Sequence, residues 1–527
     1  MSRSRRLSLL GVLPAVVAMV ATFAGPAAAA PDTADDAIVR TADGAVRGTV
    51  DPDHRIFQNI PYAKPPAGDL RLRAPRPNEP WDGVRDATEP GQWCAQVYRY
   101  PPDAPPTFQG GEDCLNLNIH VPRGADKPLP VMVFLHGGGF VGGSGVGYDP
   151  RRVTAGGDVI VVTVNYRLGA LGFLRHASLR DPYAGNFGIA DHQAALRWVR
   201  KNIAAFGGDD RNVTLWGESA GGFSVCAQLS SPAARGLFDK AIVHSSPCGN
   251  DFLTRREADR RGRVAAADLG CKDVDDVAAC LRDVPVEKIA ELYFDGIGAF
   301  RNVASAPWVP TSGTSPIPLQ PLAAARTGLA NDVPLIHGGT REEMRAHVAQ
   351  QYDGAGKPIT AAQYPTVVEK TFGGDAGKVL AEYPHTDFAS PSIALATALS
   401  DEGGLVGACS QLPYDAAANR RAPVYAYEFA EPTDDVEGDM PLLSSHGADI
   451  PYFFDSYLPG PPKPPFSEAR QALADDLIAK WTAFAHTGRP GSGWTRYRDG
   501  VALSFHSERS GPVNVAAEHR CRFWRSL

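Results

Sequence analysis

The stretch VTLWGESAGGFSVCAQL, residues 213–229, combines a strand, a tight turn and a helix. Residues 213–217 are typical of a buried strand, and residues 220–229 are compatible with a helix. The G-x-S-x-G pattern between them fits a serine held up as a nucleophile on a sharp elbow. On these residues alone, Ser219 is also compatible with a small polar residue in a tight turn, where Gly, Ser and Ala are common. The rest of the chain decides between these readings.

Further apolar, β-rich runs recur along the chain and alternate with helical segments. Several are apolar on both faces, as strands covered by helices on both sides must be. The predicted strands cover residues 131–138, 159–167, 213–217, 241–246, 333–339 and 424–429. Alternation of strand and helix predicts an α/β fold with a mainly parallel sheet and right-handed crossovers. We expect one large α/β domain with insertions.

Two segments carry apolar residues at helical spacing, residues 188–206 and 469–484. Ser467 is placed to start the second helix, and Gly488 is placed to end it. Stretches rich in Pro and Gly are predicted to form long surface loops at 101–111, 305–318 and 459–465.

The amino-terminal segment 1–29 has the order and size of a secretory signal peptide. Three arginines precede an apolar run over 7–23, and small residues at 27–29 provide a cleavage site. We expect cleavage after Ala29, which leaves a secreted protein of residues 30–527 as a single domain. In an oxidising compartment the eight cysteines are expected to pair.

Composition excludes several partners. The net charge is −7, and no basic electrostatic footprint is visible, which argues against nucleic acid and anionic membranes. No later apolar run is long enough to span a bilayer, so we expect no stable membrane anchor. The sequence does not indicate the oligomeric state.

A serine hydroxyl needs a base to act as a nucleophile, and the base needs a third group to hold it. The developing oxyanion needs donors already in place, and HGGGF (136–140) follows a predicted strand and can supply them. The alternative is an ordinary glycine turn. In an elbow of this kind the expected chain order is serine, acid, histidine.

Histidine is the candidate base, and His446 is favoured because it lies in a loop with a flexible glycine behind it. His486 ends a predicted helix, while His506 and His519 are predicted to lie at the surface. The complete set of candidates is His347, His385, His446, His486, His506 and His519.

Longer motifs now carry a family resemblance. FGGDDRNVTLWGESAGG (206–222) resembles the serine signature of type-B carboxylesterases, the family that includes cholinesterases and bile-salt lipases. EDCLNLNIHVP (112–122) resembles their second signature, with Asn116 where an aromatic residue or threonine is usual. The likeness runs from about residue 38 onward. It implies an α/β-hydrolase fold and ester hydrolysis without a metal or cofactor.

The resemblance also assigns the members of a catalytic triad. PLIHGGTREEM (334–344) aligns with the family's acid segment so that Glu343 is the acid. Met344 stands where the family has glycine, which leaves a slip to Glu342 open. HGADIPYFF (446–454) matches the segment of the base and implies His446. With Ser219, these residues form the expected triad.

The oxyanion donors implied by the family are the N–H groups of Gly138, Gly139 and Ala220. Glu218 precedes the nucleophile, as is usual in the family. It is expected either to tune the site electrostatically or to serve as a hydrogen-bonded buried acid of the elbow.

The family pattern further implies three disulfide bonds. Cys226 and Cys248 have no family partners; they either pair or remain free buried thiols, the outcome that is more frequent for unassigned cysteines. The implied pairs are Cys94–Cys114, Cys271–Cys280 and Cys409–Cys521.

The leading hypothesis is a secreted serine esterase that cleaves small-molecule esters through an acyl-enzyme on Ser219. The loop between Cys94 and Cys114 has no tryptophan, which does not favour choline as the substrate group. A lipase acting on long-chain esters is the alternative. A non-catalytic binding module of the same fold is disfavoured because serine, acid and histidine are all present.

Overall fold

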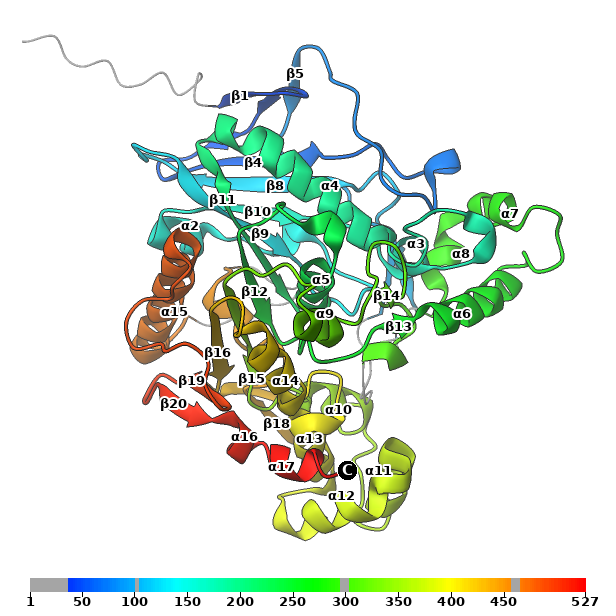
Figure 1. Cartoon of the computed structure of the whole chain (residues 1–527), viewed down its shortest axis with the longest axis vertical. Helices are drawn as coiled ribbons and strands as arrows, with labels where there is room; N and C mark the ends of the chain where they lie inside the picture. Colours follow the sequence, from blue (N-terminus) through cyan, green and yellow to red (C-terminus); the bar gives the residue numbers. More distant parts are fainter. Residues whose placement is uncertain (1–36, 100–103, 294–302, 456–464) are drawn as a thin grey trace, which may run out of the picture.

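A computed structural model describes residues 37–99, 104–293, 303–455 and 465–527. The predicted signal peptide therefore lies outside the described residues. The fold is built around a mixed eleven-stranded sheet with helices on both faces (Figure 1). In spatial order its strands are β20 (Gly511–Asn514), β19 (Val501–Phe505), β16 (Val424–Phe429), β15 (Leu335–Thr340), β12 (Lys240–His244), β11 (Gly208–Glu218), β9 (Leu129–Leu135), β10 (Ile160–Val164), β8 (Asn116–Pro122), β4 (His54–Pro61) and β3 (Thr49–Val50).

The centre of this sheet is parallel. All neighbours from β10 to β19 run parallel, whereas β8, β4 and β3 at one end and β20 at the other are antiparallel. Each of the six predicted strands is present, so the predicted mainly parallel sheet is confirmed. Its parallel strands all end at the same edge, where loops collect.

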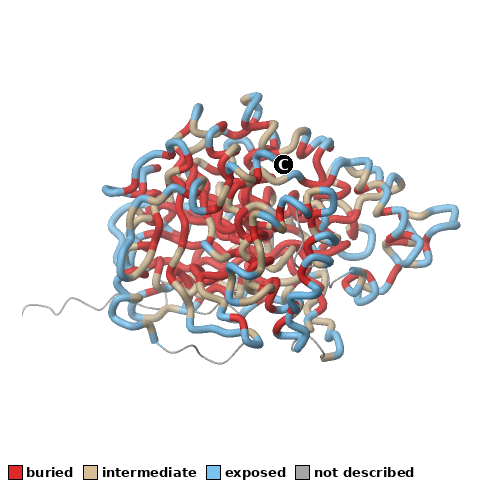
Figure 2. Tube along the Cα trace, turned by 90° about the horizontal axis from the view of Figure 1, so that it is seen from below, coloured by how far each residue is buried: buried red, intermediate tan, exposed pale blue. Residues whose placement is uncertain are grey.

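Side chains of the central strands alternate between two cores. On β9, Val131, Val133 and Leu135 face one core, while Met132 and Phe134 face the other. All of them are fully buried. Figure 2 shows that buried residues fill the interior and exposed ones form an outer shell. Burial of both faces explains why these strands are almost uninterrupted apolar runs.

Helices cover both faces of the sheet, and two of them lie in the segments 188–206 and 469–484 that carry apolar residues at helical spacing. α4 (Phe187–Asn202) and α5 (Ala220–Leu229) pack on one face, and α2 (Arg151–Gly157) and α15 (Glu468–Thr487) pack on the other (Figure 1). α15 starts where the Ser467 hydroxyl accepts a hydrogen bond from the N–H of Arg470, at 3.3 Å, and it ends at Gly488 with φ of 74°. Both predicted helix ends are confirmed.

The remaining strands and helices lie in the insertions and connections. The strands are β1 (Ile38–Thr41), β2 (Gly44–Arg47), β5 (Val84–Asp86), β6 (Gln96–Tyr98), β7 (Thr107–Gln109), β13 (Leu253–Thr254), β14 (Thr311–Ser312), β17 (Thr433–Glu437) and β18 (Met440–Leu443). The helices are α3 (Gly169–Phe173), α6 (Arg255–Asp268), α7 (Val277–Asp283), α8 (Val286–Glu291), α9 (Pro321–Thr327), α10 (Arg345–Gln351), α11 (Tyr364–Phe372), α12 (Ala376–Glu382), α13 (Pro391–Ala398), α14 (Ala408–Ala418), α16 (Val515–Glu518) and α17 (Cys521–Trp524).

The prediction of a surface loop over 305–318 is wrong for much of that stretch. Trp308 and Ile317 are buried, and β14 pairs with β13. The indole N–H of Trp308 donates to the carbonyl of Leu292 at 2.9 Å. Proline and glycine punctuate this segment, but its apolar residues pack into the core, which composition alone does not reveal.

Four disulfide bonds link the described cysteines, and none of these cysteines is free. Three of the bonds are the pairs that the resemblance implies: Cys94–Cys114, Cys271–Cys280 and Cys409–Cys521. The fourth joins Cys226 to Cys248, so of the two outcomes left open these cysteines pair, and the expectation of free thiols, the outcome given as more frequent, is wrong. α5, which carries Cys226, packs on β12, and this places Cys226 beside the loop that follows β12.

Within the described ranges, no helix has both the length and the apolar character needed to cross a membrane.

Candidate active site

Ser219 lies on the turn between β11 and α5. Its φ of 53° is in the left-handed region, which is strained for a residue with a side chain. Its N–H donates to the carbonyl of His244 at 3.1 Å, and its own carbonyl accepts from Phe223 in the first turn of α5. A Cβ on Gly221 would lie 1.9 Å from the carbonyl oxygen of Leu135, so only glycine lets the helix pass this close. The small residues of the motif thus hold the half-buried serine on a sharp elbow.

The imidazole of His446 lies against this serine. Its Nε2 is 2.9 Å from the Ser219 hydroxyl oxygen, although 227 positions separate the two residues in the chain. The backbone N–H of His446 also donates to the backbone carbonyl of Glu343 at 3.2 Å, which anchors the loop that carries His446. The 2.9 Å between Nε2 of His446 and the Ser219 hydroxyl oxygen is short enough for transfer of the serine proton to a general base.

The carboxylate of Glu343 holds the other side of the ring. Its Oε2 lies 2.7 Å from Nδ1 of His446, and its Oε1 accepts a hydrogen bond from the N–H of Thr340 at 2.8 Å. The neighbouring Glu342 instead accepts a hydrogen bond from the hydroxyl of Ser444. The structure therefore brings Glu343, and not Glu342, to the histidine.

Two buried carboxylates set the electrostatics of the imidazole. Burial alone lowers the pKa of His446, but the carboxylate of Glu343, with Glu218 next in strength, reverses this and raises the pKa to about 9. Glu218 Oε1 lies 3.4 Å from Nε2 of His446. Burial raises the pKa of Glu218 to about 8, against the opposing charge of His446. Glu218 therefore faces the base directly.

His347 is a neighbour of the site that the sequence did not identify. It was only one of six candidate bases, yet its ring packs on that of His446 with centroids 5.1 Å apart. Burial lowers the pKa of His347 to about 3, so it stays neutral and adds no charge beside the base. Its place on α10, one turn after Glu343, was the available signal.

The other candidate histidines contact groups elsewhere in the fold. His519 was predicted to lie at the surface, and this prediction is wrong. Its ring is buried between Asp401 and Glu428, at 2.8 and 2.9 Å. Paired charges can be buried, and polarity along the sequence does not reveal the pairing. The remaining three contact Tyr364 (His385), the Gly157 carbonyl (His486) and Glu431 (His506).

Three N–H groups are available beside the serine elbow. Gly138 and Gly139 have φ of 110° and 60°, so the loop after β9 has a conformation that suits glycine. Ala220 is the first residue of α5. In the part of the chain that the structure describes, no protein group accepts a hydrogen bond from these three N–H groups. They are free to act as donors to an anionic oxygen.

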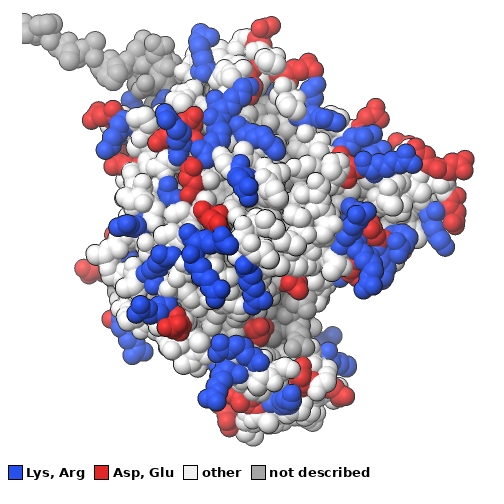
Figure 3. All heavy atoms as spheres, in the orientation of Figure 1, with Lys and Arg blue, Asp and Glu red and all other residues white. Residues whose placement is uncertain are grey.

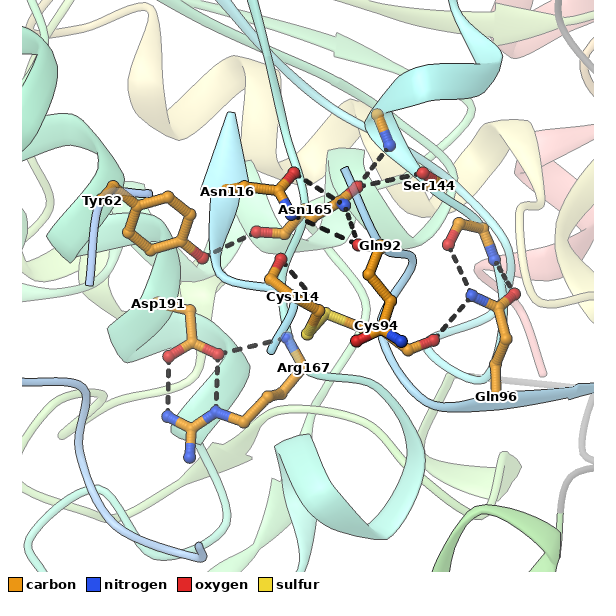
Figure 4. Close-up of a disulfide and its surroundings, with 12 residues drawn as sticks. Tyr62, Gln92, Cys94, Gln96, Cys114, Asn116, Ser144, Asn165, Arg167 and Asp191 are labelled. Atoms are coloured by element: carbon orange, nitrogen blue, oxygen red, sulfur yellow. Dashed lines mark hydrogen bonds and ion pairs between the residues drawn. A yellow bond between two sulfur atoms is a disulfide. The ribbon is translucent and has the colours of Figure 1, made fainter. Parts of the chain in front are cut away.

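The first disulfide loop supports this glycine loop. The side-chain amide of Gln96 donates to the carbonyl of Gly143 and accepts from its N–H, both at 2.9 Å (Figure 4). Asn165 accepts from the hydroxyl of Ser144 at 3.1 Å, and its amide donates to Asn116 at 3.1 Å. Asn116, the departure from the family motif, thus takes part in a buried amide network.

A second histidine lies beneath the elbow. Asp449, from the same segment as His446, accepts a hydrogen bond from Nδ1 of His244 at 2.7 Å. The indole N–H of Trp481 donates to Nε2 of His244 at 2.8 Å, which places the ring proton on Nδ1. Because the His244 carbonyl holds the N–H of Ser219, this network fixes the floor of the elbow.

Among the described side chains, no cluster of three or more His, Cys, Asp and Glu is arranged to hold a metal ion.

Comparisons with known proteins identify the family of this chain. The model of the carboxylesterase family matches residues 35–524. The chain belongs to the carboxylesterase family. It is 33% identical to para-nitrobenzyl esterase of Bacillus subtilis, over 88% of this chain and 93% of that protein. It is 32% identical to fumonisin B1 esterase of Sphingopyxis macrogoltabida, over 93% and 90% of the two chains.

Solved structures agree with this assignment. A thermophilic para-nitrobenzyl esterase superposes with a TM-score of 0.77 at 31% identity, covering 93% of this carboxylesterase and 99% of that chain. The fold is therefore the α/β-hydrolase fold, as the resemblance implied. The protein is a carboxylic-ester hydrolase.

Proposed function

We propose that this carboxylesterase cleaves esters through a covalent acyl-enzyme on Ser219. The observation that carries the proposal is the continuous chain of contacts from Ser219 to His446, at 2.9 Å, and from His446 to Glu343, at 2.7 Å. A nucleophile, a base and an orienting acid within hydrogen-bond reach are the parts that this chemistry needs.

In the first step the Ser219 hydroxyl attacks the ester carbonyl carbon while Nε2 of His446 takes its proton. The imidazolium that forms is stabilised by Glu343, which stays ionised. The alcohol leaves with the proton that His446 returns to it, and the acyl group remains on Ser219. Water then attacks the acyl-enzyme with His446 again as the base, releasing the acid.

The negative oxygen of each tetrahedral intermediate would be held by the N–H groups of Gly138, Gly139 and Ala220. Support comes from their position beside the elbow and from the absence of a protein acceptor among the described residues. Removing one donor of this kind typically lowers kcat by roughly 10²–10³.

The protein acts as a secreted enzyme in this proposal, with residues 30–527 as one domain. Support comes from the signal-peptide pattern of residues 1–29 and from four disulfide bonds, which persist in oxidising compartments. Small-molecule esters are the substrates, and para-nitrobenzyl esters are the first class to test, because relatives carry that name.

A phosphonate that labels active serines tests the proposal directly. Intact-protein mass spectrometry should show one adduct, and peptide mapping should place it on Ser219. The Ser219→Ala variant should gain no adduct and should lose hydrolysis of p-nitrophenyl butyrate by about 10⁴-fold or more. An adduct at another residue, or an active Ser219→Ala variant, would contradict the proposal.

A series of p-nitrophenyl esters with rising acyl length separates an esterase from a lipase. For an esterase, kcat/KM falls as the acyl chain lengthens, and the rate of hydrolysis does not rise sharply when the substrate concentration exceeds its solubility limit. The Ser219→Ala variant measured in parallel removes the contribution of spontaneous hydrolysis.

A further inference from the structure

A surface groove away from the catalytic triad is lined by several arginines. It lies between the segment 175–184 and the start of α6, with Thr314 and Ser315 at its side. Its volume of about 380 Å³ is within the range of small-ligand sites. Figure 3 shows Lys and Arg side chains gathered over α6, although the chain as a whole has a net charge of −7.

The charges that line this groove are unequal. Arg175, Arg180 and Arg255 face Asp181 and Asp259. His176 also lines the groove, and burial together with the nearby charge of Arg263 lowers its pKa. Cations therefore outnumber carboxylates in and around the groove.

The two carboxylates already have partners. Asp181 accepts hydrogen bonds from the N–H groups of Ala74 and Tyr183, at 3.1 and 2.8 Å. Asp259 lies 2.9 Å from Arg175 and 3.9 Å from Arg255. Neither carboxylate has to be neutralised by a ligand.

Arginines without such partners remain. Within the described part of the chain, Arg180 and Arg263 have no carboxylate within salt-bridge distance. Arg180 follows the short helix Ala177–Leu179 with φ of 46°, and it is exposed on the rim of the groove. The guanidinium group of Arg255 lies 3.9 Å from the carboxylate of Asp259, and the side chain of Arg255 is 63% exposed. The guanidinium groups of Arg180 and Arg255, which line the groove, can turn toward a bound anion.

The chemistry of the lining selects the ligand. Guanidinium groups bind phosphate and carboxylate oxygens in pairs, and hydroxyl groups at 314 and 315 add neutral donors. The lining residues include no Phe, Tyr or Trp, so His176 is the one aromatic ring of the lining that a nucleobase could contact. We propose that this groove is a binding site for a compact oxyanion with two or more negative charges, of the diphosphate class.

Titration calorimetry with inorganic pyrophosphate tests the site in the full-length protein. The matched pair of variants is Arg180→Gln/Arg255→Gln, which removes two cations from the groove, and Arg256→Gln/Arg211→Gln, which removes two exposed cations that do not line it. We expect the first pair to weaken binding by at least about tenfold, and the second by less than about twofold.

Catalysis provides an independent readout. The Arg180→Gln/Arg255→Gln variant should hydrolyse p-nitrophenyl butyrate like the wild type, and the Ser219→Ala variant should bind pyrophosphate like the wild type. Acetate at equal ionic strength should not compete. No binding at millimolar pyrophosphate would overturn the proposal. Equal loss in both double variants, or loss of binding in Ser219→Ala, would do the same.

Discussion

Oε1 of Glu218 lies 3.4 Å from Nε2 of His446, the nitrogen that also faces Ser219. A carboxylate at this position stabilises the protonated imidazole and so opposes its action as a base until the pH is high. Burial raises the pKa of Glu218 itself to about 8, against the opposing effect of His446. The two groups therefore titrate in the same range and influence one another.

The variant Glu218→Gln should move the acid limb of the pH profile of kcat/KM to lower pH by about one unit. The pKa of His446 is raised to about 9, and ionised Glu218 contributes to that rise; removing the negative charge lowers it. Stopped-flow hydrolysis of a p-nitrophenyl ester from acid to alkaline pH measures the shift. Glu342→Gln is the matched control, and a shift of equal size in both variants would reject the assignment.

The variant Glu343→Gln should lower kcat by about 10⁴-fold, because the ring of His446 loses the acceptor that fixes its proton on Nδ1. Glu342→Gln should retain most of its activity, since that carboxylate bonds to Ser444 and not to the histidine. Steady-state kinetics of both variants decides between them. A greater loss in Glu342→Gln would assign the acid to the neighbouring residue.

The variant Gln96→Leu should lower kcat by about tenfold or more with a smaller change in KM. Both hydrogen bonds between this amide and Gly143 are lost, and the glycine loop after β9 is held less firmly. Gln471→Leu, on the exposed face of α15, is a control for a lost glutamine. Unchanged kcat with raised KM would show that Gln96 serves substrate binding instead.

The variant His519→Gln should reduce stability by an amount that depends on pH. Burial lowers the pKa of His519, but Asp401 and Glu428 outweigh it and raise the pKa from 6.5 to about 10. The raised pKa means that the ion pairs contribute fully below pH 6.5 and are lost as pH rises through about 10.

The difference in Tm between wild type and His519→Gln should therefore be largest at pH 6 to 6.5 and shrink toward pH 10. Near neutrality, breaking a buried ion pair costs about 3–5 kcal/mol. Calorimetric scans from pH 6 to 10 at fixed ionic strength measure this trend. A Tm difference that does not vary with pH would indicate that His519 stabilises the fold by packing and not by its ion pairs.

The sequence predicted the framework well, because the framework depends on local patterns. Each predicted strand was a continuous apolar run, and α15 has both of the ends that Ser467 and Gly488 indicate. The motifs also pointed to the residues that the structure brings together as Ser219, Glu343 and His446. Chain order and motif context were sufficient for that step.

Contacts between distant parts of the chain were beyond reach of the sequence. Gln96 and Gly143 are 47 positions apart, and neither carries a signature of their pairing. His519 was expected at the surface, since its neighbours are polar, but Asp401 and Glu428 come from two other segments to neutralise it. The apolar residues between 305 and 318 were likewise hidden among prolines and glycines.

The disulfide bonds have a consequence for how the polypeptide matures. Along the chain, each cysteine is joined to the next one to emerge: Cys94 to Cys114, Cys226 to Cys248, Cys271 to Cys280 and Cys409 to Cys521. A translocating chain that meets an oxidase sees its cysteines in this order. For the secreted protein that we propose, joining the cysteines in order of arrival gives the native set directly, without reshuffling of mispaired bonds.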